Sequence, residues 1–429
     1  MGRVVGLQCL RCGAQVAPWP APPSCPSCRT PEFASNVVCV YDAAGADAAQ
    51  GGGAGPHAEA MRRAAAESGG VWRFAPWLPD VPVPVTLGEG GTPLVPLRRL
   101  GLEGGLSHLW LKDESQNPTW SFKDRLISVA MSVASAHDVP GILAASTGNH
   151  GASTAAYAAR AGLPCVVFTM ASTPATILTF IQAYGGMVVV LPTAADCWRM
   201  VGECVEQWEW FPTTNGGLPP VGSTPFGLEG YKTIAYEVAA SLGWVPPDVM
   251  IIPVSAGDGL IGVWRGFQDL LAMGVIDRAP RLIAAEPYAA YAEAVHAPPR
   301  RLVTVAGADS RAFNVGTTVP TYHGLYALQQ SGGDVIVIDD EAILAVQRRL
   351  AATEGIYAEA SSVIGVAAAL RLAEEKRLPP DASVVCLSTS SGLKDPAVTA
   401  AGLPRVPAID PDMGALARVL ESTYRFVRD

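Results

Sequence analysis

Lysine is scarce in this chain: 429 residues contain only five lysines, against 25 arginines. A surface that needs only positive charge can use arginine, so each lysine is a candidate for a chemical role. The lysine amine can lose its proton and become a nucleophile, whereas the arginine guanidinium stays charged. Lys123 is the lysine of interest, because it lies between an aromatic and an acidic residue in the segment NPTWSFKDR, residues 117–125.

The chain also has no excess of positive charge. Its formal net charge is −9, which argues against a general nucleic-acid binder. Charged residues make up 16% and hydrophobic residues 49%, a composition typical of a folded, core-rich protein and not of a disordered one.

Long apolar runs are absent from the sequence, so we expect no membrane-spanning segment. The first residues, MGRVVGLQCL, lack the apolar stretch and the small-residue cleavage site of a secretory signal. These two absences predict a soluble, cytoplasmic protein without a membrane partner, and the net charge predicts that it has no nucleic-acid partner.

Four of the nine cysteines form two CxxC pairs separated by twelve residues: Cys9, Cys12, Cys25 and Cys28. Each pair can direct two thiolates to one point, and two pairs complete a tetrahedral zinc site. Disulfides and a redox-active CxxC are the alternatives, but a cytosolic chain disfavours the first and the doubled motif disfavours the second. We predict a structural zinc ribbon over residues 1–40.

Beyond residue 86, apolar runs typical of strands alternate with helical stretches, as in GILAAS before GNHGASTAAYAARAG and DVMIIPVS before GLIGVWRGFQDLLAMG. This alternation predicts an α/β fold with mostly parallel sheets covered by helices. In such sheets ligands bind at the carboxyl ends of the strands, beside helix N-termini. An Ala/Gly-rich segment, 42–56, reads as a linker before a short helix that ends at the Gly69-Gly70 pair.

Three strand-to-helix turns are small and polar: STGNHG (146–151), SAGDGL (255–260) and LSTSSGLKDP (387–396). The first two can offer backbone N–H groups to an anion at a helix N-terminus, and the third offers a row of hydroxyls. In the second turn, Asp258 must direct its carboxylate away from a bound phosphate. Taken singly, each turn has an ordinary alternative as an N-cap or a Ser/Gly turn. Together with a reactive amine they match the needs of pyridoxal phosphate (PLP).

The segment NPTWSFKDR resembles the lysine segment of fold-type II PLP enzymes, closest to the threonine synthases. Other segments are similar in the same order: WRFAPWLP (72–79), LGEGGTPL (87–94), STGNHG, VSAGDGL and SSGLKDP. The resemblance runs from about residue 72 to 396. It implies two domains with twisted, mostly parallel sheets, a small amino-acid substrate and a homodimer.

The resemblance also implies residue roles. Lys123 would bind the cofactor covalently and then act as base and acid at the substrate carbons. Asn149 would contact the 3-hydroxyl of the cofactor, and Thr389 its pyridine nitrogen. The cofactor phosphate would be bound by Ser255, Ala256, Gly257, Asp258 and Gly259. The substrate carboxylate would be bound by Ser146, Thr147, Gly148 and His150.

The sequence departs from the threonine synthase pattern at three positions. Trp120 replaces a small glycine beside the lysine, so we expect it to narrow or reshape the cavity. His150 replaces a threonine and gives GNHG, a form similar to that of amino-acid ammonia-lyases. Gly227 replaces the arginine expected to bind the substrate phosphate, and Arg125, which could compensate, is expected to support the fold instead.

Three functions follow as alternatives. The first is a threonine synthase that converts O-phospho-L-homoserine to L-threonine and phosphate. The second is an ammonia-lyase or β-replacement enzyme of the same fold, acting on serine, threonine or 2,3-diaminopropionate. The third is a zinc-ribbon protein that uses a non-catalytic homologue of the enzyme for binding or regulation.

The expected domain organisation follows the same resemblance. Beyond the zinc ribbon, residues 41–85 form the linker and short helix, and residues 120–235 a small domain. A large PLP-binding domain combines 86–119 with 236–405, and a C-terminal helical tail covers 406–429.

Overall fold

The computed structural model describes residues 2–42, 55–214, 216–295, 302–307 and 310–426. It divides into a unit spanning Met1–Lys394 and a second unit spanning Asp395–Asp429. Most of the predicted linker, residues 43–54, lies outside the described residues, and the short helix after it is α2, Pro56–Ala66.

The first unit begins with a small antiparallel sheet in the order β2-β1-β3. Its strands are β1 (Val4–Cys9), β2 (Gln15–Val16) and β3 (Val37–Tyr41). The two CxxC pairs lie in and between these strands. This three-stranded sheet therefore brings the four cysteines close together.

A six-stranded sheet has the order β12-β11-β10-β13-β5-β4, and only the edge pair β4–β5 is antiparallel. Its strands are β4 (Leu94–Pro96), β5 (His108–Asp113), β10 (Val249–Pro253), β11 (Arg281–Glu286), β12 (Asp334–Val337) and β13 (Ser383–Ser388). Strands β10, β11 and β13 are almost wholly buried, which explains their continuous runs of apolar residues.

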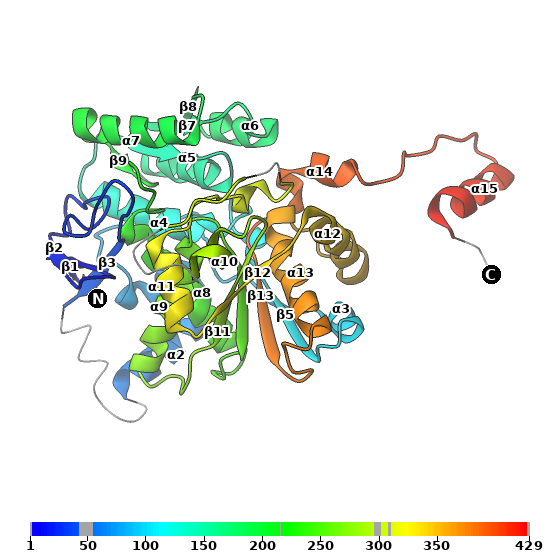
Figure 1. Ribbon diagram of the computed structural model, residues 1–429, viewed down its shortest axis with the longest axis horizontal. Coiled ribbons are helices and arrows are strands. Elements are labelled where there is room, and N and C mark those ends of the chain that lie inside the picture. Colours follow the sequence, from blue (N-terminus) through cyan, green and yellow to red (C-terminus); the bar gives the residue numbers. More distant parts are fainter. Residues whose placement is uncertain (1, 43–54, 215, 296–301, 308–309, 427–429) are drawn as a thin grey trace. The chain divides into compact units, whose positions relative to one another are not determined.

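A second sheet has four parallel strands in the order β8-β7-β6-β9. Its strands are β6 (Ile142–Ala145), β7 (Cys165–Thr169), β8 (Met187–Val190) and β9 (Phe211–Pro212). Figure 1 shows helices α5 (Asn149–Ala161), α6 (Ala175–Ala183) and α7 (Ala194–Trp208) grouped around this sheet. The predicted α/β fold with mostly parallel sheets is confirmed.

The remaining helices of the first unit are α3 (Arg98–Glu103), α4 (Lys123–Ala136), α8 (Pro225–Ser241), α9 (Asp258–Ala272), α10 (Ala290–Val295), α11 (Tyr322–Gln330), α12 (Asp340–Glu354) and α13 (Ala360–Glu374). Short 3-10 helices cover Val71–Trp77, Glu114–Gln116, Phe313–Val315 and Gly392–Lys394. The second unit contains α14 (Pro396–Ala400) and α15 (Met413–Tyr424). None of the helices within the described ranges is long and apolar enough to cross a lipid bilayer.

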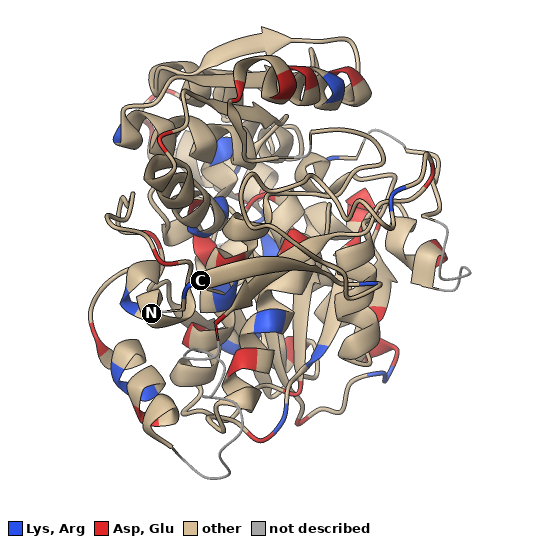
Figure 2. Cartoon of the chain, turned by 90° about the vertical axis from the view of Figure 1, so that its left-hand side faces the viewer, with Lys and Arg blue, Asp and Glu red and all other residues tan. Residues whose placement is uncertain are grey.

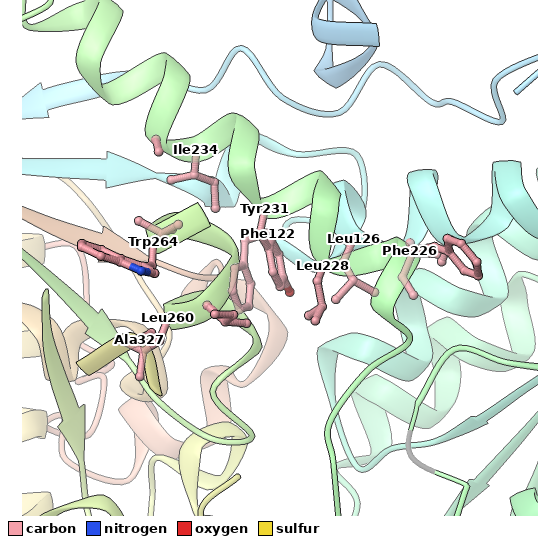
Figure 3. Packing of buried hydrophobic residues seen from close by; sticks show 14 of the residues in the cluster. Phe122, Leu126, Phe226, Leu228, Tyr231, Ile234, Leu260, Trp264 and Ala327 are labelled. Atoms are coloured by element: carbon pink, nitrogen blue, oxygen red, sulfur yellow. The ribbon is translucent and has the colours of Figure 1, made fainter. Parts of the chain in front are cut away.

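Helix α8 lies between α4 and α9 and is buried around its whole circumference for most of its length. Glycines allow this close approach: a Cβ on Gly230 would lie 2.0 Å from the backbone oxygen of Arg125. Figure 3 shows the resulting apolar cluster, in which the rings of Phe122 and Tyr231 stack at 4.7 Å. This packing fixes the start of α4, where Lys123 lies.

Charged residues of both signs are scattered among the elements (Figure 2). Several of them are fully buried, including Lys112, Glu114, Arg125, Glu229 and Lys232. Buried charges are costly unless they are paired, so their partners decide what each can do.

Candidate active site

A cavity of about 350 Å³ opens at the carboxyl ends of strands from both parallel sheets. All twelve residues predicted to bind cofactor or substrate line it: Lys123, Ser146, Thr147, Gly148, Asn149, His150, Ser255, Ala256, Gly257, Asp258, Gly259 and Thr389. Residues from segments more than 250 positions apart in sequence therefore meet at one site.

Lys123 is the first residue of α4, and its Nζ lies 4.9 Å from the ring centroid of Phe122 and 5.9 Å from that of Tyr231. No acceptor among the described residues lies within hydrogen-bonding or ion-pair distance of this Nζ. Burial lowers the pKa of the amine, and the negative charge of Asp258 opposes the shift only in part. The neutral, nucleophilic form is therefore more accessible than in a solvated lysine.

The turn after β10 offers backbone donors. Gly257 caps α9 with φ 80°, and a Cβ there would lie 2.6 Å from Oη of Tyr291. Within the described residues, the N–H groups of Ser255 through Gly259 have no hydrogen-bond acceptor. Free N–H groups at the start of a 15-residue helix suit a phosphate, so the turn fits the phosphate of PLP.

The carboxylate of Asp258 is held by Ser223 and His323. Its carboxylate accepts hydrogen bonds from the backbone N (3.1 Å) and Oγ (2.6 Å) of Ser223, and lies 3.3 Å from Nε2 of His323. Although burial opposes it, these partners keep the pKa of Asp258 well below its usual range. The carboxylate is thus engaged with Ser223 and His323.

Asn149 and Thr389 face the cavity from opposite sheets. Nδ2 of Asn149 donates to Oε2 of Glu359 at 3.0 Å, and Oγ1 of Thr389 lies 2.9 Å from Oγ of Ser362. A neutral hydroxyl, and not a carboxylate, is therefore what the third turn presents to the cavity.

The turn 146–150 is closed by its own serine, because Oγ of Ser146 accepts from the N–H groups of Gly148 (3.1 Å) and Gly151 (3.0 Å). His150 pairs with Oγ1 of Thr213 at 3.1 Å. Burial, with the nearby charge of Lys123, lowers the pKa of His150 to about 3. The imidazole is consequently neutral near pH 7 and offers a hydrogen bond to an anion, not a charge.

The expectation that Trp120 narrows the cavity is wrong. Trp120 is 42% exposed and does not line the cavity. Its φ of 59° lies in the left-handed region, where its ring packs edge-on against Phe180 of α6 with the centroids 5.5 Å apart. Because the backbone there is left-handed, the side chain leaves the site.

Gly227 lies in the first turn of α8 and packs against α4. A Cβ at this position would lie 2.8 Å from side-chain atoms of Leu126, and Gly227 does not line the cavity. Among the described lining residues, Lys123 is the only lysine or arginine. The arginine missing from the sequence is therefore not replaced by another cation in this cavity.

Arg125 supports the fold, as predicted. Its guanidinium is fully buried and bonds both oxygens of Glu114 (2.6 and 2.9 Å) and of Glu237 (2.7 and 2.9 Å). Lys112 adds a contact of 2.6 Å to Glu237. This network fixes α4 in place, and none of its carboxylates pairs with Lys123.

The four cysteines of the CxxC pairs form one cluster, with all Sγ atoms within 4.8 Å of one another. Burial raises the pKa of Cys9, but hydrogen bonds from the N–H groups of Cys12 and Arg11 and contact with Ser35 outweigh it and lower the pKa to about 6. Thiolates in this arrangement fit a closed tetrahedral zinc site.

Sequence reasoning missed several residues that support the site. Asn36, next to the cysteine cluster, accepts from the backbone N of His323 at 3.1 Å, and Nε2 of His323 lies 2.7 Å from the backbone oxygen of Ala256. Glu359, Asn314 and Ser362 support the other side. Each is a common polar residue in an unremarkable segment, so only the tertiary contacts identify it.

The fold and the converging turns define a fold-type II PLP enzyme. The chain belongs to the pyridoxal-phosphate dependent enzymes, since the sequence pattern of that family matches residues 85–390.

Within this family the chain is similar to threonine synthases. It is 34% identical to the threonine synthase of Methanocaldococcus jannaschii, over 82% of this chain and 87% of the relative. It is 30% identical to that of Methanosarcina acetivorans, over 91% and 92% respectively.

Solved structures share the fold at lower identity. Threonine deaminase isoform 2 of Solanum lycopersicum superposes with a TM-score of 0.61 and 22% identity, covering 72% of this chain and 87% of that one. Maize serine racemase gives 0.61 and 21%, covering 86% and 97%.

Proposed function

We propose that this protein is a PLP-dependent lyase of the threonine synthase type, which converts O-phospho-L-homoserine to L-threonine and phosphate. The observation that carries the proposal is that a half-buried amine, with no ion-pair partner among the described residues, meets a turn of free N–H groups and a hydroxyl cluster in one cavity. Similarity to threonine synthases over most of the chain supports the substrate.

We assign a separate role to each group of residues in the cavity. Bound PLP supplies a ring that accepts the electrons left on a substrate carbon after a proton is removed. Nζ of Lys123 binds the cofactor and serves as the base that takes the α-proton and the acid that returns it. The N–H groups of 255–259 bind the phosphate, Asn149 the 3-hydroxyl and Thr389 the ring nitrogen.

The turn 146–150 orients the substrate carboxylate. Ser146, Thr147, Gly148 and the neutral His150 surround it at the N-terminal end of the α5 dipole, and Lys123 is the only lysine or arginine among the described residues that line the cavity. Orientation by neutral donors leaves the negative charge of the carboxylate uncompensated except by Lys123.

The architecture around the site follows the same proposal. The six-stranded sheet supports a large domain of 86–119 with 236–405, and the four-stranded sheet supports a small domain of 120–235. The cysteine cluster supports a structural zinc ion bound by Cys9, Cys12, Cys25 and Cys28.

A second function is favoured by one specific observation. A phosphorylated substrate brings a second phosphate into the cavity, where Lys123 is the only lysine or arginine among the described lining residues. An amino acid without a phosphate, such as serine, threonine or 2,3-diaminopropionate, avoids that penalty. The reaction would then be elimination to a keto acid and ammonia, or β-replacement.

The test is a phosphate-release assay on PLP-loaded protein given O-phospho-L-homoserine, with threonine measured in parallel. Phosphate and threonine in equal yield support the threonine synthase function. No phosphate from protein that shows the absorption of bound cofactor contradicts it. Keto acid and ammonia from one of the other three amino acids would then support the second function. Lys123→Ala protein is the control for background hydrolysis.

A further inference from the structure

Glu359 is a buried carboxylate whose two amide partners, Asn149 and Asn314, line the cavity. It precedes α13 and is 2% exposed. Oε2 accepts from Nδ2 of Asn149 at 3.0 Å, and Oε1 accepts from Nδ2 of Asn314. No lysine, arginine or histidine in the described part of the chain forms an ion pair with it. The two amides are therefore its direct side-chain contacts.

The backbone around Glu359 ties it to the third turn of the site. Its N–H donates to the backbone oxygen of Ser390 at 3.1 Å, and Oγ of Ser390 lies 3.4 Å from Oδ1 of Asn149. Lys394 is 1% exposed, its Nζ has no hydrogen-bond partner among the described residues, and it is close enough for its charge to interact with Glu359.

Asn314 is pressed onto the turn that is proposed to hold the substrate carboxylate. A Cβ on Gly148 would lie 1.8 Å from Oδ1 of Asn314, and the backbone N of Asn314 donates to Oγ of Ser361 at 3.1 Å. The side chain of Asn314 can occupy this place only because residue 148 is glycine.

An ionised carboxylate accepts hydrogen bonds and donates none. Both amides must therefore present N–H groups to Glu359, since a flipped amide would place its oxygen against a carboxylate oxygen. For Asn149 this leaves the second N–H of Nδ2 for the cavity. The acceptor-only character of Glu359 selects one of two amide orientations that would otherwise be similar in shape.

We propose that Glu359 is a positioning residue that fixes the side-chain amide of Asn149 toward the cofactor and holds Asn314 against the 146–150 turn. The inference rests on the proposed function, in which Asn149 contacts the 3-hydroxyl of PLP. Glu359 touches neither cofactor nor substrate in this arrangement and acts through the two amides.

Glu359→Gln tests the idea directly, because glutamine has the same shape but can also donate, and so permits the flipped amide. We expect the dissociation constant of PLP from the apoprotein to rise about tenfold or more, as for loss of a hydrogen bond to a charged group. In Glu359→Gln, the pH at which the visible absorption of the bound cofactor titrates should also fall, because the variant lacks the carboxylate that favours the protonated form of the cofactor. Glu359→Asp, which remains acceptor-only, should recover part of both effects.

Two comparisons separate positioning from a purely structural role. Glu341→Gln, at an exposed position in the first turn of α12, should change neither readout. In an Asn149→Ala background, Glu359→Gln should have little further effect on PLP affinity, since its partner is gone.

Wild-type affinity and titration in Glu359→Gln would overturn the inference, as would an equal loss with and without Asn149. If Glu359→Gln fails to fold, Glu359→Asp in both backgrounds carries the same test. A wild-type protein that binds no PLP would instead overturn the proposed cofactor site itself.

Discussion

Lys123 and Arg125 lie two residues apart on α4, and the protein treats their charges in opposite ways. Arg125 is surrounded by two carboxylates that bond its guanidinium and raise its pKa above the usual value despite burial. Lys123 faces aromatic rings and a cavity, where burial lowers its pKa. The difference shows how one helix can carry both a structural cation and a reagent, because two carboxylates pair with Arg125 and none pairs with Lys123 among the described residues.

Replacing Lys123 should abolish turnover without destabilising the fold. We expect Lys123→Ala and Lys123→Arg to lose at least about 10³-fold in turnover, because neither side chain can serve as amine nucleophile and base. Unfolding of the apoprotein should be unchanged or occur at higher temperature, since Lys123 has no ion-pair partner among the described residues. Turnover assays and thermal unfolding measure the two effects. Near-normal turnover of Lys123→Arg would refute the role of the amine.

Replacing Arg125 should lower the free energy of unfolding. Arg125→Met leaves Glu114 and Glu237 buried without their main partner, which typically costs about 3–5 kcal/mol of unfolding free energy. Chemical denaturation of the apoprotein measures it. Arg199→Met is the matched control, because Arg199 is 57% exposed in its side chain and its pairs with Asp196 and Glu203 lie at the surface. A loss for Arg125→Met no larger than that of the control would contradict the assigned role.

We expect the cysteine cluster, like Arg125, to support the fold and to take no part in the chemistry. Cys9→Ser should remove or weaken bound zinc and destabilise the N-terminal sheet, while PLP stays bound. Metal analysis and cofactor absorbance of the same sample report both results. Cys204→Ser, at a buried cysteine outside the cluster, is the control. Metal content that is unchanged in Cys9→Ser would show that the zinc assignment is wrong.

A smaller effect concerns the pH dependence of cofactor attachment. The rate at which apoprotein binds PLP covalently should rise with pH and reach half its maximum below about 10.4, the usual lysine pKa, since burial favours the neutral amine. Asp258→Asn removes an anion that stabilises the ammonium form, so its midpoint should lie lower still. The lowered pKa of Lys123 also affects stability. Because the folded chain binds fewer protons at Lys123 than the unfolded chain, this group stabilises the folded state more as the pH rises toward the usual lysine pKa. A midpoint at or above the usual lysine pKa would contradict the environment described for Lys123.

The sequence allows the converging turns to be predicted because their composition is unusual. Glycines and hydroxyl residues directly after apolar strands indicate where backbone N–H groups are exposed, and the parallel fold brings those ends together. The turns 146–151, 255–260 and 387–396 are predicted in this way, whereas Lys123 stands out by the scarcity of lysine and the role of Thr389 follows from the resemblance to fold-type II PLP enzymes.

Side-chain direction and long-range partners could not be predicted in the same way. Trp120 leaves the cavity because its backbone is left-handed, a property that no pattern of neighbouring residues indicates for tryptophan. Gly227 reads as a missing arginine, yet its position is closed by Leu126 from another helix. The contacts of Glu359 with Asn149 and of Asn36 with His323 join chain segments roughly 200 or more positions apart, which no local pattern indicates.

The most direct test of the account is to reduce PLP-loaded protein with borohydride and locate the modified lysine by peptide mass spectrometry. The chain has only five lysines, so the assignment is unambiguous. The account predicts the cofactor mass on the peptide containing Lys123, and its absence there in Lys123→Ala. Cofactor on Lys394, the other lysine near the third turn, or on no lysine, would contradict it.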